Sequence, residues 1–264
     1  MKKQKLEILL TNDDGYLSKG FKEAVEICAG FGNVTAIGPK FPQSGKSASL
    51  TMGEALWMDK IEERAHSNGN AIRIFYFSGS PADCVKIAMN TEFSLKRKPD
   101  ILVSGINHGS NASAAAIYSG TLGAAKEAAI YGIPALALSL DCHDENADFA
   151  VVRKFAPKII ENFLSAPPKN GIYINVNFPY IPIKEVKGYK FAEQGKGMWI
   201  KEFKKYPTPR GGNFYMMFGQ FIDCDKKHVG DHTAVSEGYI SIVPHNIDTT
   251  DRYEKERLAN LWKL

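Results

Sequence analysis

The chain has 264 residues, of which 44% are hydrophobic and 23% are charged. These fractions match folded globular proteins and exclude a disordered or fibrous class, and a chain of this length buries a sizeable core without disulfides. The formal net charge of +4 is small and the Lys and Arg residues are scattered, so we expect no nucleic-acid polymer as a partner.

Cysteine usage and hydropathy both bear on the compartment. The four cysteines lie far apart with no paired spacing, which argues against a zinc site or redox motif and predicts a reducing compartment. No stretch approaches the roughly 20 apolar residues of a membrane span, and the apolar run at 6–10 is too short for a signal peptide. We therefore expect a cytoplasmic protein with no membrane partner.

Strand-like and helix-like segments alternate along residues 1–180, the predicted catalytic core. Segments 99–105 and 134–139 carry consecutive apolar residues, as strands buried in a parallel sheet do. Ser80 followed by Pro81 is typical of a helix start. Strands are predicted at 6–10, 34–37, 72–77, 99–105, 134–139 and 171–177, and helices at 19–29, from 81 onward, at 121–131 and at 148–164. The alternation predicts a doubly wound, mostly parallel α/β sheet.

Residues 181–264 have a different character, with Gly-, Pro- and Lys-rich loops between predicted strands at 186–191, 213–222 and 239–243. We expect mixed or antiparallel strands here, parts of which rejoin the core sheet. The segment 213–222 is hairpin-like, and 251–264 is predicted as a terminal helix. The apolar members of that helix are Tyr253, Leu258, Leu261 and Trp262. A helix this apolar needs a partner surface, which favours a homo-oligomer.

Two adjacent acids, Asp13 and Asp14, follow the first predicted strand in the sequence TNDDG. Ligands of open α/β sheets bind at the carboxyl ends of the strands, so this loop is in the expected position for a site. Adjacent carboxylates repel each other unless a cation neutralises them, and oxygen ligands favour Mg²⁺ or Mn²⁺. An acidic turn explains Asp-Asp-Gly equally well, so other residues have to decide between the two interpretations.

Two further polar loops are predicted at carboxyl ends of strands. One carries Ser44 and Gly45, whose hydroxyl and backbone could bind metal or phosphate, although the glycine spacing of a Walker A loop is absent. The other carries Asn107 and Asn111, whose amide oxygens add ligands to a cation without adding charge. Each loop alone is also explained as an ordinary turn.

A fourth polar segment begins the Ala-rich helix. Ser119, Gly120 and Thr121 offer hydroxyls and unpaired N–H groups, which together bind anions, although a plain Ser/Thr N-cap has the same sequence. The four segments together supply carboxylates, hydroxyls, amides and an anion site. This combination favours metal-assisted phosphoryl hydrolysis.

Six motifs, in order along nearly the whole chain, resemble the SurE family (survival protein E, 5′/3′-nucleotidases). They lie at 11–15, 43–45, 104–107, 118–121, 175–177 and 238–242. The resemblance implies a three-layer α/β/α Rossmann-like core, with a C-terminal β-hairpin extension and a terminal helix used in dimer or tetramer assembly. It also implies one divalent cation per subunit, Mg²⁺ or Mn²⁺. By position, the cation ligands would be Asp13, Asp14, Ser44 and Asn107.

The same resemblance implies hydrolysis of nucleoside 5′- and 3′-monophosphates, with short polyphosphate as a further substrate. Asp13, Asp14 and Asn107 would act in catalysis. The phosphate-binding residues would be Ser44, Gly45, Asn111, Ser119, Gly120 and Thr121. A bound cation polarises a phosphoryl oxygen and lowers the pKa of a bound water, while the phosphate-binding groups stabilise the charge that develops in the transition state.

The chain departs from the family pattern at two points. Ala114 and Ala115 lie where several members have acidic residues, and Arg252 lies near the position of a His in some members. His108, next to a proposed ligand, is therefore a candidate for the acid that protonates the leaving alcohol. A loop His is more often simply solvated or hydrogen-bonded.

Two other functions compete with the nucleotidase. A catalytically silent nucleotide-binding regulatory protein would predict an eroded ligand set, whereas all four proposed ligands are present. A dinucleotide enzyme is disfavoured because no GxGxxG follows the first strand and paired acids would repel a pyrophosphate. His228 and His232 lie among lysines without a metal-binding motif and are expected at the surface.

Overall fold

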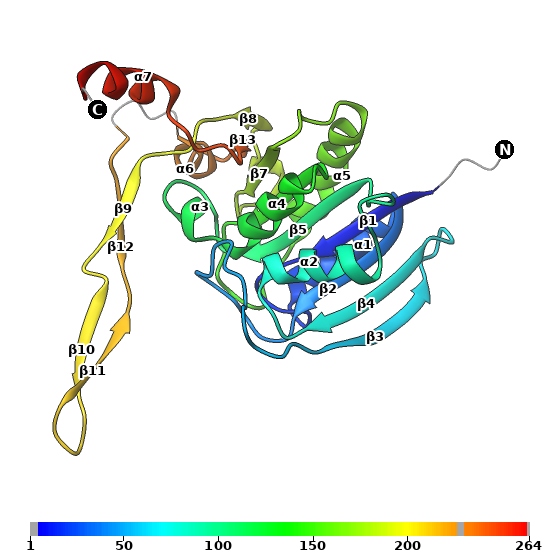
Figure 1. Ribbon diagram of the computed structural model, residues 1–264, viewed down its shortest axis with the longest axis horizontal. Helices are drawn as coiled ribbons and strands as arrows, with labels where there is room; N and C mark the ends of the chain where they lie inside the picture. The colour runs from blue at the N-terminus through cyan, green and yellow to red at the C-terminus, as the bar shows by residue number, and fades with distance from the viewer. Residues whose placement is uncertain (1–4, 226–229, 263–264) are drawn as a thin grey trace.

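The computed structural model describes residues 5–225 and 230–262, and its centre is a nine-stranded sheet (Figure 1). The order across the sheet is β3-β4-β2-β1-β5-β6-β7-β13-β8. Its strands are β1 (Leu6–Thr11), β2 (Gly32–Pro39), β3 (Met58–Ala65), β4 (Ala71–Phe77), β5 (Ile101–His108), β6 (Ala135–Leu140), β7 (Ile172–Phe178), β8 (Tyr189–Phe191) and β13 (Ile240–Asn246). Neighbouring strands are parallel except β3 with β4 and β13 with β7. The predicted mostly parallel sheet is confirmed.

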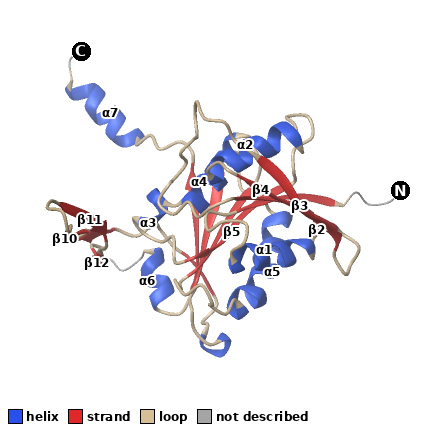
Figure 2. Ribbon diagram, turned by 90° about the horizontal axis from the view of Figure 1, so that it is seen from below, coloured by secondary structure: helices blue, strands red, loops and turns tan. Residues whose placement is uncertain are grey.

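Helices cover both faces of this sheet, as Figure 2 shows. The helices α1 (Lys19–Ala29) and α5 (Ala150–Ser165) lie on one face, and α2 (Pro81–Thr91) and α4 (Gly120–Ile130) lie on the other. Each face has its own cluster of buried apolar side chains, one around Phe21 and Phe149 and one around Leu102 and Leu122. This arrangement confirms the three-layer α/β/α fold.

Local sequence explains where the helices begin. Ser18 caps α1 by accepting a hydrogen bond from the Phe21 N–H, and Ser80 and Asp83 form a capping box at the start of α2, where Pro81 is the first helical residue. A side-chain oxygen at an N-cap satisfies one of the backbone N–H groups that a helix leaves unpaired. The predicted starts of both helices are confirmed.

The direction in which the chain builds the sheet reverses between β1 and β5. From β1 the chain adds β2 and then β4 on one side, returns to pair β5 with the other side of β1, and continues to β6 and β7. Adjacent loops diverge at such a switch point and leave a crevice for ligands. Asp13 and Asp14 follow β1, and Asn107 lies near the end of β5, so all three belong to this edge of the sheet.

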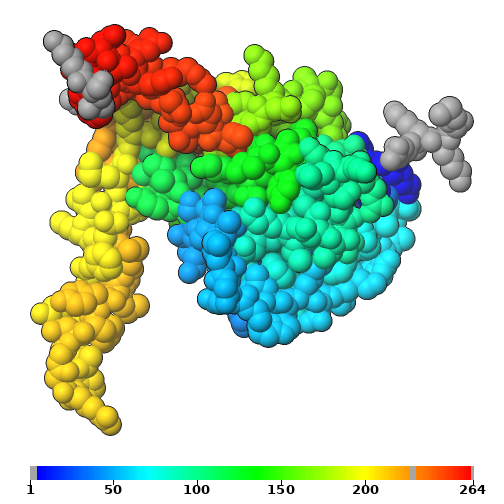
Figure 3. Space-filling model, viewed as in Figure 1, coloured from blue at the N-terminus to red at the C-terminus, as the bar shows by residue number. Residues whose placement is uncertain are grey.

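A two-stranded arm projects from the body of the molecule (Figures 1 and 3). It pairs β9 (Gly197–Ile200) with β12 (Gln220–Asp223), and β10 (Phe203–Pro207) with β11 (Asn213–Met217). The predicted C-terminal β-hairpin extension is confirmed as this arm, although the segment 213–222 forms only one of its two sides. The chain reverses at Gly211 and Gly212, whose positive φ angles of 82° and 91° suit a tight turn.

Several short or exposed elements were not predicted from sequence. They are the edge strand β3, the helices α3 (Ala115–Tyr118) and α6 (Asp231–Ser236), the 3₁₀ turn Ile183–Glu185, and β9 and β10 of the arm. The terminal helix α7 (Arg252–Leu261) was predicted and is present, without a single buried residue. Within the described residues, no helix combines the length and the apolar character needed to cross a membrane.

Candidate active site

Asp13 and Asp14 lie in a loop whose shape is fixed by hydrogen bonds. Asn12 Nδ2 donates to the Gly15 carbonyl oxygen and to Ser18 Oγ, each at 3.0 Å. The Asp13 side chain is buried, with only 3% of the residue exposed. A solvated acidic turn would leave this carboxylate in water, so its burial favours the interpretation as a site.

The N-terminus of α4 lies directly against Asp13. Thr121 Oγ1 donates a hydrogen bond to Asp13 Oδ1. A Cβ atom on Gly120 would lie 2.8 Å from Asp13 Cβ and 3.0 Å from Asp13 Oδ2, so this close approach requires glycine. The structure therefore brings two of the predicted phosphate-binding residues together with the first predicted metal ligand.

The electrostatics of the acid pair are unfavourable without a cation. Burial, followed by the charge of Asp14, raises the pKa of Asp13 from 3.8 to about 6, while hydrogen bonds from Thr121 oppose the rise. Among residues 5–225 and 230–262, no Lys or Arg forms an ion pair with either acid; Asp14 pairs with His108. A cation between the two carboxylates would favour their ionised forms.

His108 contacts Asp14 rather than open solvent. Its backbone N–H donates to Asp14 Oδ2 at 2.9 Å, and its Nδ1 atom lies 3.1 Å from the same oxygen. The ring packs edge-on against Phe149, with ring centroids 5.2 Å apart. His108 is therefore hydrogen-bonded, and its two contacts orient the carboxylate of Asp14.

Asn107 and Asn111 lie on either side of Gly109 near the end of β5. Asn107 Nδ2 donates to the Gly109 carbonyl oxygen at 2.7 Å, so Oδ1 is the Asn107 atom that could face a cation. Asn111 is buried, and its Nδ2 donates to Ser139 Oγ at 2.8 Å. The Asn111 side chain is thus already engaged with β6.

The loop of Ser44 and Gly45 follows β2 and is exposed. The preceding Gln43 N–H donates to the Asp13 carbonyl oxygen at 2.7 Å. Ser47 N–H and Oγ donate to the last two carbonyl oxygens of α3, each at 2.9 Å. The loop therefore spans from Asp13 to the segment that precedes α4.

Two buried amides that sequence reasoning did not assign to the site hold the backbone of Asn111. Asn177 Oδ1 accepts from the Asn111 N–H at 2.7 Å, and Asn175 Nδ2 donates to the Asn111 carbonyl oxygen at 2.9 Å. Buried amides persist only with partners. Polar residues at alternate positions of an otherwise apolar strand are the signal that could have identified them.

Sequence reasoning also missed another buried carboxylate, Asp231 at the start of α6. Its Oδ1 atom accepts hydrogen bonds from backbone N–H groups of two distant segments. The side chain of His232 is only 16% exposed and its Nε2 lies 3.0 Å from Asp223 Oδ1, so the expectation of a surface residue is wrong for His232. His228 lies outside the described residues.

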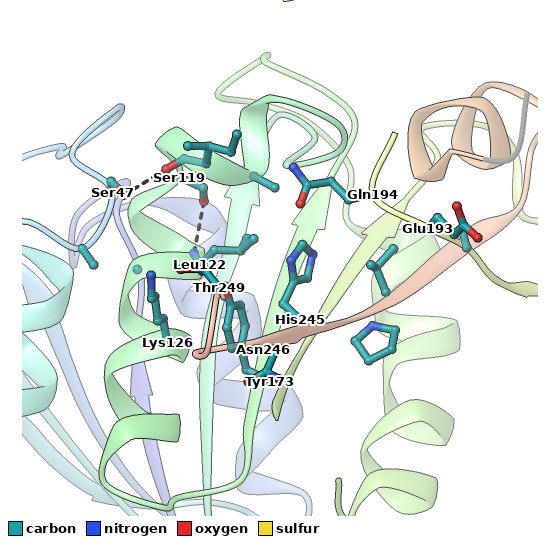
Figure 4. A pocket seen from close by; sticks show the side chains of 17 residues that line it. Ser47, Ser119, Leu122, Lys126, Tyr173, Glu193, Gln194, His245, Asn246 and Thr249 are labelled. Atoms are coloured by element: carbon teal, nitrogen blue, oxygen red, sulfur yellow. Dashed lines mark hydrogen bonds between the residues drawn. The ribbon is translucent and has the colours of Figure 1, made fainter. Parts of the chain in front are cut away.

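A cavity of about 650 Å³ lies beside α4, and Figure 4 shows it between that helix and β13. Ser47 and Ser119 line it, so the cavity borders the predicted phosphate site. His245 points from β13 into the cavity and stacks on Tyr173, with ring centroids 5.4 Å apart and ring planes 16° apart. Burial lowers the pKa of His245. The volume is within the range of small-molecule sites.

The acid pair Asp13 and Asp14 has the donor chemistry of a site for a hard divalent cation. In the described parts of the chain, no three His, Cys, Asp or Glu side chains gather closely enough to hold a metal by themselves. Two carboxylates completed by the neutral oxygens of Ser44, Asn107 and water would form an all-oxygen ligand set. Such a set suits Mg²⁺ or Mn²⁺ rather than a thiolate- or imidazole-bound metal.

Comparisons with known proteins agree with this architecture. The family model described as survival protein SurE matches residues 8–201. The 5′-nucleotidase SurE of Flavobacterium johnsoniae is 42% identical and that of Christiangramia forsetii 41% identical, each over 100% of this chain and 99% of the relative. The crystal structure of the SurE protein from Aquifex aeolicus has a TM-score of 0.79 and 33% identity, over 97% of this chain and 99% of that one. The chain therefore belongs to the SurE family.

Proposed function

We propose that this chain is a 5′-nucleotidase that hydrolyses nucleoside monophosphates to nucleoside and phosphate with one bound divalent cation, Mg²⁺ or Mn²⁺. The proposal rests on the buried Asp13 beside Asp14 at the N-terminus of α4, an acid pair without a Lys or Arg partner in the described chain. Relatives similar over their full length bear the name 5′-nucleotidase. A catalytically silent nucleotide-binding protein has no need of a buried Asp13 beside a second acid with so little counter-charge.

The protein itself orients the groups that would hold the cation. The ligands would be Asp13, Asp14, Ser44 and Asn107. Thr121 donates a hydrogen bond to Asp13 Oδ1, and His108 donates one to Asp14 Oδ2. The other oxygen of each carboxylate would therefore be available to the cation. When bound, the cation supplies a Lewis acid for a phosphoryl oxygen and lowers the pKa of a water molecule.

The phosphate would lie at the N-terminus of α4, next to the Ser44–Gly45 loop. Ser119 Oγ accepts from the Leu122 N–H, so its own O–H is available to donate. Backbone N–H groups at a helix N-terminus attract anions, and donors aimed at the phosphoryl oxygens stabilise the charge of the transition state. Asn111 would contribute through the backbone segment that Asn175 and Asn177 hold.

The nucleoside would occupy the cavity beside α4, because the cavity and the phosphate site share Ser119. A base in this cavity could stack on His245, and such stacking contributes about 1–3 kcal/mol. We expect His245→Ala to lower the ratio of kcat/KM for AMP to kcat/KM for ribose 5-phosphate about tenfold. Equal losses for both substrates would contradict this position of the base.

The proposal extends to nucleoside 3′-monophosphates and short polyphosphate, since the predicted phosphate-binding groups would contact only the terminal phosphate. It includes a homodimer, or a tetramer, assembled by residues 181–264 through the arm and α7, with the site in residues 1–180. A cytoplasmic location stays a prediction, with which the four free cysteines agree.

Phosphate release from AMP and GMP tests the proposal directly. Activity should require Mg²⁺ or Mn²⁺ and should disappear in EDTA, because the proposed reaction depends on the cation to polarise the phosphoryl oxygen and to lower the pKa of a bound water. Full activity in EDTA would contradict the metal mechanism. No release from any nucleoside monophosphate with either metal would contradict the nucleotidase itself.

A further inference from the structure

Asp231 joins three segments that are far apart in the sequence. It is fully buried, and its Oδ1 atom accepts hydrogen bonds from the backbone N–H groups of Ser113, Gly195 and His232, each at 2.9 Å. Within residues 5–225 and 230–262, no Lys or Arg pairs with this carboxylate; its nearest basic group is His232 Nδ1 at 3.9 Å. Burying a carboxylate costs free energy that hydrogen-bond donors offset. The three donors at Oδ1 therefore fix the position of Asp231, and it fixes theirs, while Oδ2 is buried without a partner among the described residues.

Ser113 is the midpoint of the segment that carries most of the proposed site. Asn107 and Asn111 precede it, and the first turn of α4 follows it. Its φ angle is +55°, a conformation that non-glycine residues adopt only when the surroundings hold them there. Its N–H donates to Asp231 and its carbonyl oxygen accepts from Gln194 Nε2 at 3.1 Å. Both backbone polar groups of Ser113 are thus held by one assembly.

The same assembly includes the base of the arm. His232 Nε2 lies 3.0 Å from Asp223 Oδ1 in β12, and its ring packs against Phe221 with centroids 5.6 Å apart. A Cβ atom on Gly195 would lie 2.0 Å from His232 Nδ1, so the segment around Gly195 is packed tightly onto the same ring. The arm, the 193–195 segment and Ser113 therefore meet at Asp231 and His232.

We propose that Asp231 is a positioning residue of the nucleotidase reaction: it holds Ser113, and through Ser113 it sets the separation between the Asn107–Asn111 region and the N-terminus of α4. The inference rests on the proposed function. Asp231 acts through backbone hydrogen bonds on the segment that binds the phosphate. Small misplacements of catalytic groups cost up to about 100-fold in rate even when the change lies far from the chemistry.

Asp231→Ala and Asp231→Asn separate positioning from simple stability. The alanine variant removes the acceptor, so kcat for AMP per folded molecule should fall about 10- to 100-fold with a smaller change in KM. The asparagine variant keeps the shape and one acceptor oxygen and should recover kcat to within about fivefold of wild type. Asp83→Ala is the matched control: Asp83 is also buried and accepts backbone N–H groups, those of Ser80 and Thr51.

Thermal unfolding and circular dichroism give the folded fraction for each variant. A kcat for Asp231→Ala within twofold of wild type, or an equal loss in Asp83→Ala, would overturn the proposal. Should Asp231→Ala fail to fold, Asp231→Ser, whose hydroxyl is too short to reach all three N–H groups, is the second test: residues 107–121 should take up deuterium faster than in wild type. Unchanged exchange and unchanged kcat would overturn it. A wild-type protein that releases no phosphate from AMP would instead contradict the proposed function. The exchange result would still test whether Asp231 holds residues 107–121 in place.

Discussion

The site edge of the sheet and the two-stranded arm distribute polar and apolar side chains in opposite ways. At the site edge, polar side chains are buried, as in Asp13 at 3% exposure and Asn177 at 0%. On the arm, large apolar side chains are exposed, as in Phe203 at 62% and Met217 at 68%. Buried polar groups need partners, whereas clustered exposed apolar side chains mark contact surfaces. The difference agrees with the proposal of a small polar ligand for one region and a protein partner for the other.

Removing one charge from the site edge should have the largest effect. Asp13→Asn keeps the shape of the side chain but removes the carboxylate beside Asp14, so kcat for AMP hydrolysis should fall at least about 100-fold and a higher Mg²⁺ concentration should be needed for half-maximal activity. Phosphate release measured against Mg²⁺ concentration tests both expectations, and circular dichroism checks the fold. Glu161→Gln removes an exposed carboxylate from α5 and should leave turnover unchanged. Wild-type turnover in Asp13→Asn would mean that the acids only form a turn.

The acid pair should also make the metal-free protein less stable as the pH rises. The folded-state pKa of Asp13 is about 6 and its ordinary value is 3.8, so the folded chain holds this proton more tightly than the unfolded chain. As the pH rises from about 4 through 6, the unfolded state ionises first, and the free energy of unfolding should fall by up to about 3 kcal/mol. Above about pH 6 this loss is complete.

Urea unfolding in EDTA at several pH values measures this decline. Asp13→Asn lacks the titrating group, so the free energy of unfolding should fall with rising pH in the wild type but not, through this group, in the variant. Added Mg²⁺ should restore wild-type stability at pH 7 by binding the ionised pair. The same pH dependence in both proteins would show that Asp13 titrates at its ordinary pKa. The site edge would then differ from the arm in the burial of its polar side chains but not in a strained, titrating carboxylate.

The sequence predicted the site edge better than the arm, and the reason is physical. A buried parallel strand such as β1 is a short apolar run that ends in a polar loop, so both the strand and its loop are visible locally. No residue of β9 or β10 is buried, and without a buried face these strands show no alternation of apolar and polar residues. Contacts such as Thr121 with Asp13 and Asp231 with Ser113 join residues 108 and 118 positions apart. Tertiary packing creates these contacts, and no local pattern records them.

The close approach of α4 to Asp13 offers a milder way to disturb the site edge. Gly120→Ala would insert a methyl group 2.8 Å from Asp13 Cβ, so α4 or Asp13 has to shift and kcat should fall about tenfold. Gly69→Ala is the control: Gly69 has a φ angle of +82° and open space around it, so alanine there should cost roughly 1 kcal/mol of stability without loss of turnover. Equal kcat values for wild type and Gly120→Ala would mean that the helix position has no part in catalysis.

Shortening the arm should have the smallest effect on turnover. The Phe218 N–H donates to the Glu202 carbonyl oxygen at 2.6 Å, so residues 203–217 can be replaced by a short Gly-Ser linker while β9 stays paired with β12. The exposed apolar side chains of β10 and β11 disappear with this segment, and a dimer that depends on them should dissociate to a monomer in light scattering at micromolar concentration. The kcat per subunit should change less than about twofold, because the base of the arm keeps its contacts with His232 and hence with Asp231. A shortened protein that stays dimeric would indicate that the dimer interface lies at α7 instead. A large loss of kcat would mean instead that the tip of the arm completes the site of a second subunit, and the two regions would then serve one function rather than two.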